Sequence, residues 1–158
     1  YESFSKIIIK EYNAVISQMA LREIYLHGFE IAVKEGKPKA IMTSYNKVNG
    51  YYKAETPELL NDIVRQEWGF KGLFMTYFDG YGSAVAKVRA GNNMLMSGSK
   101  EEYNELMAAL KDKTLDESTL SNNLVYNMQL KLNSPWAKGY IPSLKPDLEA
   151  HAKIAREA

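Results

Sequence analysis

The stretch Lys71-Gly-Leu-Phe-Met-Thr-Tyr-Phe-Asp-Gly80 indicates the fold more clearly than any other part of the chain. Its apolar residues from Leu73 onward are typical of a short strand that is buried on both faces. The polar side chains that follow would lie at the carboxyl end of that strand, where enzymes with parallel strands keep their reactive groups. The stretch therefore predicts an α/β protein with a candidate site around Tyr77 and Asp79.

Strand-like and helix-like segments alternate on both sides of this stretch. Apolar runs bounded by turn residues predict three strands, at 40–45, 73–77 and 93–96. Helical periodicity and capping residues predict helices at 15–35, 56–68 and 83–90, and two more at the capping boxes Ser99-x-x-Glu102 and Thr114-x-x-Glu117. Alternation of this kind is typical of a parallel sheet.

Local signals add detail to these elements. Thr56 is expected to cap the helix that begins at Pro57, and Asn49-Gly50 is a strong turn dipeptide. Residues 1–13, which include Ile7-Ile-Ile9, fit either a strand or the first turns of a helix. The helix predicted to begin at the capping box Thr114-x-x-Glu117 carries an apolar stripe at helical spacing: Leu120, Leu124, Met128 and Leu132.

Two of the predicted strand segments repeat one another. Lys39–Tyr45 and Lys71–Tyr77 match in character and are one βα unit apart. Three such units predict a partial (half) (β/α)8 barrel with parallel strands, because a whole barrel needs about 250 residues. A half barrel leaves two strand edges open, which the N-terminal helix, the C-terminal segment or a second copy of the chain, in a homodimer, could cover. We expect this barrel at 1–133, followed by a linker and the first helix of a further segment at 134–158.

Composition narrows the possible functions. The chain has 158 residues and a net charge of +1 with scattered Lys and Arg, which suggests neither a nucleic-acid partner nor a membrane anchor. No apolar run approaches the roughly 20 residues that span a bilayer. The chain has no cysteine, and its two histidines, His27 and His151, lie far apart in sequence, so no metal site is expected.

Four segments of the chain resemble the glycoside hydrolase family 3 β-glucosidases. They are Leu21-Arg-Glu-Ile-Tyr-Leu26, Ile41-Met-Thr-Ser-Tyr-Asn-Lys-Val-Asn-Gly50, Glu67-Trp-Gly-Phe-Lys-Gly-Leu73 and Ala90-Gly-Asn-Asn-Met-Leu-Met96. The resemblance covers about Val15 to Ala158 and matches the later part of the family's N-terminal (β/α)8 barrel domain. Residues after Asn133 look like the linker and the first helix of the family's second domain.

The resemblance implies a retaining glycosidase that needs no metal or organic cofactor. In such enzymes one aspartate attacks the sugar and a second carboxylate protonates the leaving oxygen. The family's nucleophile lies in a motif of the type Met-Thr-Asp-Trp, and here Tyr77 stands in the aspartate's place. Hydrolysis is therefore expected to be impaired. Asp79 is the alternative nucleophile, although an aspartate before Gly80 is also an ordinary turn former.

The resemblance also implies four substrate-binding residues for a β-glucoside or another small sugar. Tyr45 matches a tyrosine that lines the sugar subsite, although a core tyrosine would have the same pattern. Arg22 and Glu23 match a Leu-Arg-Glu motif, for which an ion pair or a solvated helix face is the simpler interpretation. Asn93 replaces a residue that is often aspartate in the family.

Three functions remain open from the sequence. The first is a β-glucosidase-like carbohydrate-binding scaffold with little or no hydrolysis. The second is an active O-glycosyl hydrolase that is completed by oligomerisation or by a missing partner segment. The third is an engineered or structural α/β module without a ligand.

Overall fold

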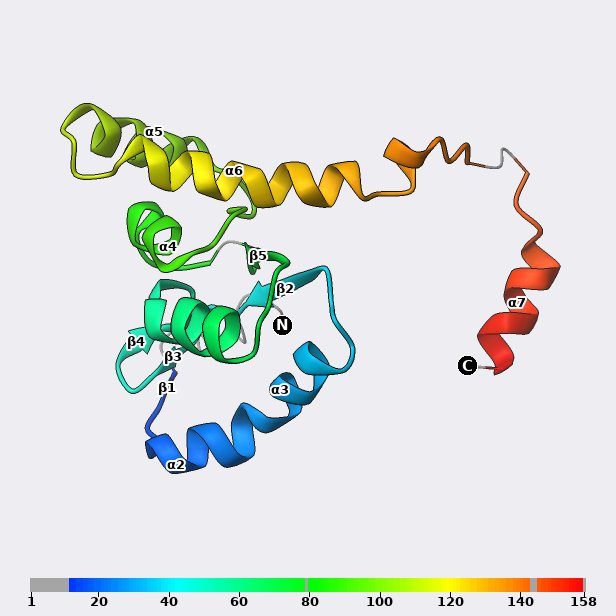
Figure 1. Cartoon of the computed structure of the whole chain (residues 1–158), viewed down its shortest axis with the longest axis horizontal. Helices are drawn as coiled ribbons and strands as arrows, with labels where there is room; N and C mark the ends of the chain where they lie inside the picture. The colour runs from blue at the N-terminus through cyan, green and yellow to red at the C-terminus, as the bar shows by residue number, and fades with distance from the viewer. Residues whose placement is uncertain (1–11, 79, 143–144, 158) are drawn as a thin grey trace.

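The computed structural model describes residues 12–78, 80–142 and 145–157, and their arrangement is an α/β fold with parallel strands (Figure 1). Strand β2 (Ala40–Thr43) pairs in parallel with β5 (Leu73–Thr76), with Ala40 opposite Leu73. The helices between and after these strands lie around the sheet. The predicted alternation of helix and parallel strand is thus confirmed. The predicted tract Ile7–Ile9 lies outside the described residues.

The expected third strand at 93–96 is wrong in extent. Only Met94 pairs with the sheet, through one isolated parallel β-bridge to Met75. The backbone N–H groups of Asn93 and Met94 both donate to the Phe74 carbonyl, and the N–H of Met96 donates to the Thr76 hydroxyl. The Thr76 N–H donates to the Met94 carbonyl as in a ladder. Because two of the other bonds share one carbonyl and the third goes to a side chain, the regular spacing of a ladder does not continue beyond Met94.

A second sheet consists of three strands of two residues each. It orders β1 (Asn13–Ala14), β3 (Lys47–Val48) and β4 (Tyr51–Tyr52), with β1 parallel and β4 antiparallel to β3. The turn between β3 and β4 is the predicted Asn49-Gly50, whose φ angles of 53° and 86° are those of a two-residue hairpin turn. The segment expected as a plain loop is therefore a hairpin.

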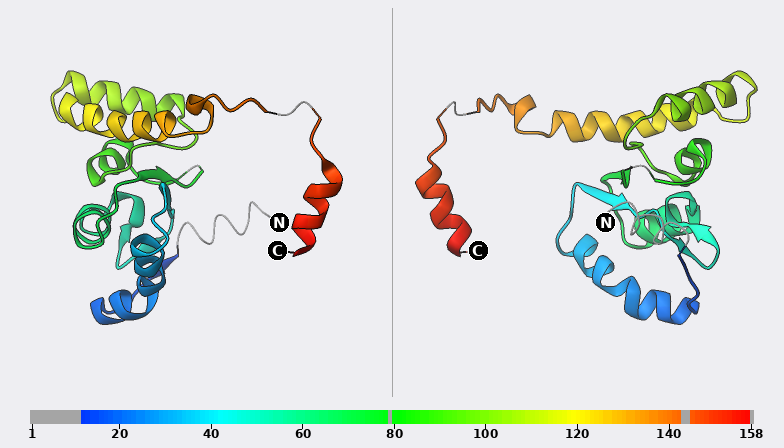
Figure 2. Two further views of the ribbon diagram at one scale, coloured as in Figure 1. Left: turned by 45° about the vertical axis from the view of Figure 1, so that its right-hand side comes forward. Right: turned by 180° about the vertical axis from the view of Figure 1, so that it is seen from behind.

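Helices and single helical turns connect the strands and follow the last of them. A nearly continuous helical path comprises α2 (Gln18–Ala20), the π-helix η1 (Leu21–Tyr25) and α3 (His27–Lys34). The later helical elements are η2 (Lys53–Glu55), η3 (Glu58–Glu67), α4 (Ala84–Ala90), α5 (Lys100–Lys111), α6 (Glu117–Leu132), η4 (Trp136–Lys138) and α7 (Leu148–Glu157). Figures 1 and 2 show α7 at the end of an extended segment, away from the other elements. None of the helices in the described ranges is long and apolar enough to cross a membrane.

One of the three predicted caps forms. The Ser99 and Glu102 side chains make the capping box of α5. The Ser83 side chain also caps α4, although no cap was predicted there. The prediction for Thr56 is wrong, because its hydroxyl donates to the Tyr52 carbonyl and η3 begins after Pro57 without a side-chain cap. The prediction for Thr114 is also wrong, because its hydroxyl donates to the Asp112 carboxylate in a local turn and α6 begins three residues later, at Glu117.

The main core lies between η3 and β5. Phe74 is fully buried and packs against Phe70, with ring centroids 4.9 Å apart. The other buried members of this cluster are Val33, Leu60, Ile63, Val64, Trp68 and Ala90. A second cluster of Val88, Ala109 and Leu115 joins α4 to the α5–α6 pair. The core therefore fixes β5 and leaves its carboxyl end free to carry a site.

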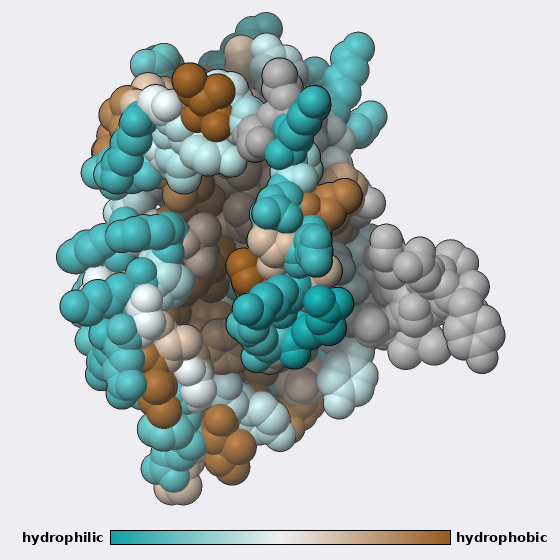
Figure 3. Space-filling view, turned by 90° about the vertical axis from the view of Figure 1, so that its right-hand side faces the viewer, coloured by the Kyte–Doolittle hydropathy of each residue, from teal (hydrophilic) through white to brown (hydrophobic). Residues whose placement is uncertain are grey.

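Several helices expose apolar side chains that their periodicity would place in a core. Ile24 of η1 is 68% exposed, and Leu124 and Leu132 of the predicted α6 stripe are 59% and 63% exposed. Figure 3 shows apolar residues gathered in a hollowed face that looks toward the α7 side of the molecule. Exposed apolar surface of this kind is typical of a face that packs against further polypeptide. The predicted boundary between 1–133 and 134–158 stays a prediction.

Candidate functional site

The carboxyl ends of β2 and β5 lie side by side and carry two tyrosines. Beyond the last strand pair, the backbone N–H of Tyr77 donates to the Thr43 carbonyl at 2.9 Å. The half-buried rings of Tyr45 and Tyr77 meet edge to face, with centroids 4.6 Å apart and planes at 79°. The structure therefore brings together two of the residues that the sequence predicts for the site.

A buried hydrogen-bond network fixes the end of β2. Asn92 is fully buried, and its side-chain oxygen accepts from the Thr43 hydroxyl at 3.0 Å. Its amide nitrogen donates to the carbonyls of Ala54 at 2.6 Å and Lys87 at 3.2 Å. One side chain thus joins β2, η2 and α4. Because each of its polar atoms has a partner, the network makes this strand end rigid.

The segment after β5 is held at two points. The backbone N–H of Gly80 donates to the Tyr77 carbonyl at 3.1 Å. The Gly80 carbonyl accepts from Lys87 Nζ at 2.6 Å, and this buried ammonium also pairs with Glu102 at 3.0 Å. The turn that follows the strand is therefore anchored to α4 and α5. Asp79, the alternative nucleophile, lies outside the described residues.

The start of α4 is bound by acidic side chains from two other elements. Ser83 N–H donates to Glu55 Oε1 at 2.5 Å, and the Ser83 hydroxyl donates to the Glu105 carboxylate. Burial alone would raise the pKa of the Glu105 carboxyl. The Ser83 hydroxyl, the N–H groups of Ala84 and Val85 and the nearby Lys87 charge all stabilise the ionised carboxylate. Together they outweigh the effect of burial, so the pKa of Glu105 lies below its ordinary value. Glu105 thus serves to hold α4 in place.

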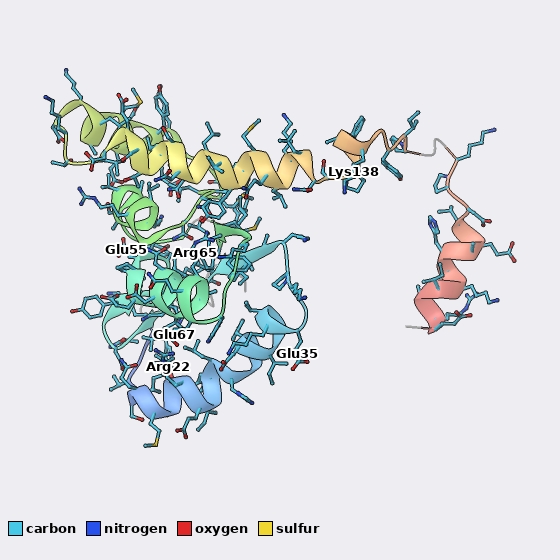
Figure 4. The ribbon with its side chains drawn as sticks, in the orientation of Figure 1. Arg22, Glu35, Glu55, Arg65, Glu67 and Lys138 are labelled. Carbon is cyan, nitrogen blue, oxygen red and sulfur yellow. The ribbon has the colours of Figure 1, made fainter. Side chains whose placement is uncertain are left out.

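Arg22 lies at the other end of the strands. Its guanidinium forms a two-pronged ion pair with Glu67 at 2.5 and 2.9 Å, and Figure 4 shows the two side chains facing one another. The hydrogen bond to Glu67 raises the pKa of Arg22, and the same bond lowers the pKa of Glu67. Glu67 ends η3 just before the amino end of β5. Glu23 is exposed on the same helical turn as Arg22. The predicted sugar-binding role of these two residues stays a prediction.

Asn93 is part of a junction near the start of β5. Its side-chain oxygen accepts from Phe74 N–H at 2.8 Å and from Arg65 at 2.9 Å, and its amide donates to Asn123 at 2.8 Å. Arg65 also lies over the ring of Tyr126, with its guanidinium carbon 4.1 Å from the ring centroid. Burial lowers the pKa of Arg65, an effect that Tyr126 partly offsets. The Asn93 side chain therefore ties η3, β5 and α6 together, and its predicted role toward a sugar remains a prediction.

The sequence analysis missed the residues that support the strand ends, namely Lys87 and Asn92. A signal for Lys87 exists, because it shares the buried face of a short helix with Ala84 and Val88. A buried lysine on such a face needs a carboxylate partner. Asn92 lies within the quoted motif Ala90–Met96, but the pattern does not show its role, because two of its three partners, Thr43 and Ala54, come from distant parts of the chain.

The site offers two aromatic rings and two phenolic hydroxyls to a ligand. A ring face contacts the apolar side of a ligand, while a hydroxyl both donates and accepts hydrogen bonds. Within the described ranges, no group of three or more His, Asp or Glu side chains could hold a metal ion. The arrangement of tyrosines suits a ligand that has one apolar face and a polar rim.

Residues 10–128 match the model of the glycosyl hydrolase family 3 N-terminal domain. The chain belongs to this family. Its four sequence motifs therefore indicated the right family, and the helices and parallel strands described above are similar to those of the family's N-terminal domain.

Several proteins that this chain resembles are named as β-glucosidases. Probable β-glucosidase J of Emericella nidulans is 41% identical over 149 residues, which make up 92% of this chain and 18% of that protein. The structure of β-glucosidase 3B from Thermotoga neapolitana in complex with α-D-glucose matches 95% of this chain and 22% of its own, with a TM-score of 0.87 and 39% identity. The family 3 β-glucosidase of Bifidobacterium adolescentis matches 96% of this chain and 22% of its own, with a TM-score of 0.83 and 32% identity. This family 3 chain thus spans about a fifth of these relatives' length.

Proposed function

We propose that this chain is a family 3 β-glucosidase-like carbohydrate-binding scaffold in which hydrolysis of β-glucosides is impaired. The observation that carries the proposal is Tyr77 at the carboxyl end of β5, where the family's motif has an aspartate. Its ring packs against Tyr45, which the sequence predicts to line the sugar subsite. We take the strands to be a section of a (β/α)8 barrel, so that these tyrosines lie at its functional end.

The different chemistry of tyrosine and aspartate side chains supports impaired hydrolysis. A retaining glycosidase forms a covalent bond between the sugar and an ionised carboxylate. A phenol stays protonated at neutral pH and is the weaker nucleophile. Sugar binding has no such requirement, because it uses aromatic faces and hydroxyl groups, which Tyr45 and Tyr77 provide.

Two measurements on the purified chain test this proposal. We expect no measurable release of the aryl group from an aryl β-glucoside, and we expect saturable chemical-shift changes on titration with glucose. Turnover by the unmodified chain that disappears in Asp79→Ala would show that Asp79 serves as the nucleophile and would overturn the proposed impairment. A lack of any shift change with glucose would favour an α/β module without a ligand.

Tyr77→Asp is the matching gain-of-function variant. It restores the family's Met-Thr-Asp order at the end of β5. A rise in aryl β-glucoside turnover would locate the defect at this one position. If Tyr77→Asp binds glucose as the parent chain does and still does not turn over, a further carboxylate from outside this chain is also needed, as the two-carboxylate mechanism requires.

The exposed apolar helices favour a second candidate, an active hydrolase completed by oligomerisation or by a partner segment. Ile24 and Phe29 on the α2–η1–α3 path are 68% and 61% exposed, and a second copy of the chain would cover such a surface in a homodimer. Sedimentation equilibrium at micromolar concentration separates the candidates. A strict monomer excludes completion by a second copy, whereas a dimer with turnover supports it.

A further inference from the structure

We infer that a cavity at the amino ends of β2 and β5 binds a small organic anion with an aromatic body. The cavity has a volume of about 690 Å³, which is within the size range of ligand pockets. Its walls come from α3, from the segments that lead into β2 and β5, and from the carboxyl-terminal half of α6. Tyr45 and Tyr77 follow the opposite ends of the same strands and do not line it. The cavity is therefore separate from the candidate sugar site.

The lining of the cavity is positively charged. Among the described residues it includes four lysines and no aspartate or glutamate: Lys34, Lys37, Lys39 and Lys71. Lys34 is neutralised by Glu30 at 2.5 Å, whereas the ion pairs of the described residues include none of the other three lysines. Of the carboxylates close by in sequence, Glu67 is paired with Arg22, and Glu35 is exposed outside the lining. An anion in the cavity would thus meet three uncompensated ammonium groups.

Backbone contacts bring the lysine-bearing segments together. The Leu73 N–H donates to the Lys39 carbonyl at 3.0 Å, so the residues before β2 lie beside those before β5. A Cβ at Gly72 would lie 2.5 Å from that carbonyl oxygen, so this close approach requires glycine. Lys37 has a left-handed backbone, with φ of 47°, which is unfavourable for residues other than glycine. The chain therefore carries a cation at a position where the backbone alone would favour glycine.

A further cation, Arg65, lies behind the cavity wall. It donates to the Gly72 carbonyl at 3.0 Å and to the Asn93 side-chain oxygen at 2.9 Å. Its guanidinium carbon is 4.1 Å from the centroid of the Tyr126 ring, between η3 and α6 (Figure 4). These partners are uncharged, and burial lowers the pKa of Arg65, because removing a charge from water is costly. Since Gly72 and Tyr126 both line the cavity, an anion there would offset this cost by Coulomb attraction.

The apolar part of the lining suits an aromatic group. It includes Val33, Trp68, Phe70, Leu73 and Leu130. Trp68 and Phe70 also belong to the main core, so their rings are held in place before a ligand arrives. A surface that is ordered in advance loses little entropy on binding. The combination of fixed rings and free cations favours an anionic head on an aromatic body over either part alone.

Isothermal titration of the full chain with phenyl phosphate at low salt tests the inference. We expect saturable binding that weakens as NaCl is added, because salt screens the cations of the cavity. Phenol and inorganic phosphate each supply only one part of the ligand, and both should bind about tenfold more weakly. An excess of glucose should leave the affinity for phenyl phosphate unchanged, because the two sites lie at opposite ends of the strands.

A triple charge variant locates the binding site. Changing all three uncompensated lysines to glutamine, in Lys37→Gln, Lys39→Gln and Lys71→Gln together, should weaken phenyl phosphate binding about tenfold. The matched control combines Lys100→Gln, Lys111→Gln and Lys113→Gln. It removes the same charge from exposed positions outside the lining and should keep the affinity within about twofold of the parent chain.

A single substitution tests the sign of the charge with almost no change in shape. Gln129 lines the cavity from α6 and is exposed, so Gln129→Glu should fold as the parent chain does. The added carboxylate should repel the ligand and weaken its binding about threefold. Asn122→Asp adds the same charge to an exposed position of α6 outside the lining and should have no such effect.

The outcomes that contradict the inference are distinct. Lack of saturable phenyl phosphate binding by the parent chain overturns it, and so does equal affinity in the parent chain and the triple lysine variant, because the anion then binds elsewhere. Phenol or inorganic phosphate binding as tightly as phenyl phosphate refutes the class of ligand. Competition by glucose refutes the separation of the two sites. The proposed sugar binding is tested by glucose alone and does not depend on these results.

Discussion

The residues around β5 and the residues along the outer helices differ in how completely their neighbours cover them. Phe74, Lys87 and Asn92 around β5 are 0%, 1% and 0% exposed, whereas Phe29 on α3 is 61% exposed. The first region has the packing of a finished core, and the second has apolar residues without cover. The difference teaches that the strand ends carrying the candidate site are supported by this chain itself, while the outer helices leave large apolar side chains exposed.

The largest effect is expected at the centre of the covered region. Phe74→Ala should lower the free energy of unfolding by about 4 kcal/mol, because it leaves a large cavity in a close-packed core. Phe29→Ala on the exposed side should change it by no more than about 0.5 kcal/mol. Urea denaturation followed by circular dichroism measures both changes. Equal losses of unfolding free energy at Phe74 and Phe29 would show that the two regions do not differ in packing.

The buried ion pair should give the next largest effect. Lys87→Met removes the ammonium that pairs with Glu102 and holds the Gly80 carbonyl, which we expect to cost about 3 kcal/mol. The matched control is Lys153→Met, because the Lys153–Glu157 pair at 4.0 Å lies on the exposed helix α7. An undetectable change in urea stability for Lys87→Met would mean that the turn after β5 is held by other contacts.

A smaller, pH-dependent effect is expected at Glu105. Its pKa lies below the ordinary 4.5, so its contribution is present in full above that value and is lost as the pH falls through the lowered pKa of the folded state. Glu105→Gln should lower stability at pH 7 by about 1 kcal/mol, since the amide accepts fewer hydrogen bonds at the start of α4. The difference from the parent chain should shrink in urea denaturation at acidic pH, and a difference that grows instead would refute the assignment.

The smallest effect is expected for the ion pair outside the covered region. Arg22→Ala removes the Arg22–Glu67 pair, whose side chains are 42% and 48% exposed. Solvent and salt screen such a pair, so the loss of stability should be smaller than in the three cases above and should vanish near 1 M NaCl. Denaturation at low and high salt measures it. A salt-independent loss would indicate that Arg22 packs or binds in a way that the pair does not explain.

Sequence patterns predicted the elements whose cause is local. The turn at Asn49-Gly50 and the capping box at Ser99 both form as expected, because each depends on residues within one turn of the chain. Thr56 and Thr114 carry the same local signal and fail. Their hydroxyl groups find other acceptors, Tyr52 and Asp112, which the pattern does not take into account.

Patterns of longer range were predicted less well. The apolar stripe of α6 follows helical spacing, yet Leu124, Met128 and Leu132 are exposed. Periodicity shows which residues share a helix face but not whether anything covers that face. In the candidate site, too, local features could be predicted and long-range contacts could not. Tyr45 and Tyr77 could be placed at strand ends from the sequence, whereas the partners of Lys87 and Asn92 became known only from the structure.

The sequence by itself determined the family, the alternation of helix and parallel strand, and the tyrosine at the position of the expected nucleophile. These features follow from residue identity and short spacings, which are fixed along the chain. Only the tertiary structure decided that Tyr45 and Tyr77 touch, that Asn92 and Lys87 secure the strand ends, and that Arg22 and Asn93 bond elsewhere in the fold. Such contacts form between groups that are distant in sequence. A buried polar or charged group needs a hydrogen-bond or ion-pair partner because water is excluded, and only the folded chain determines which partner it meets.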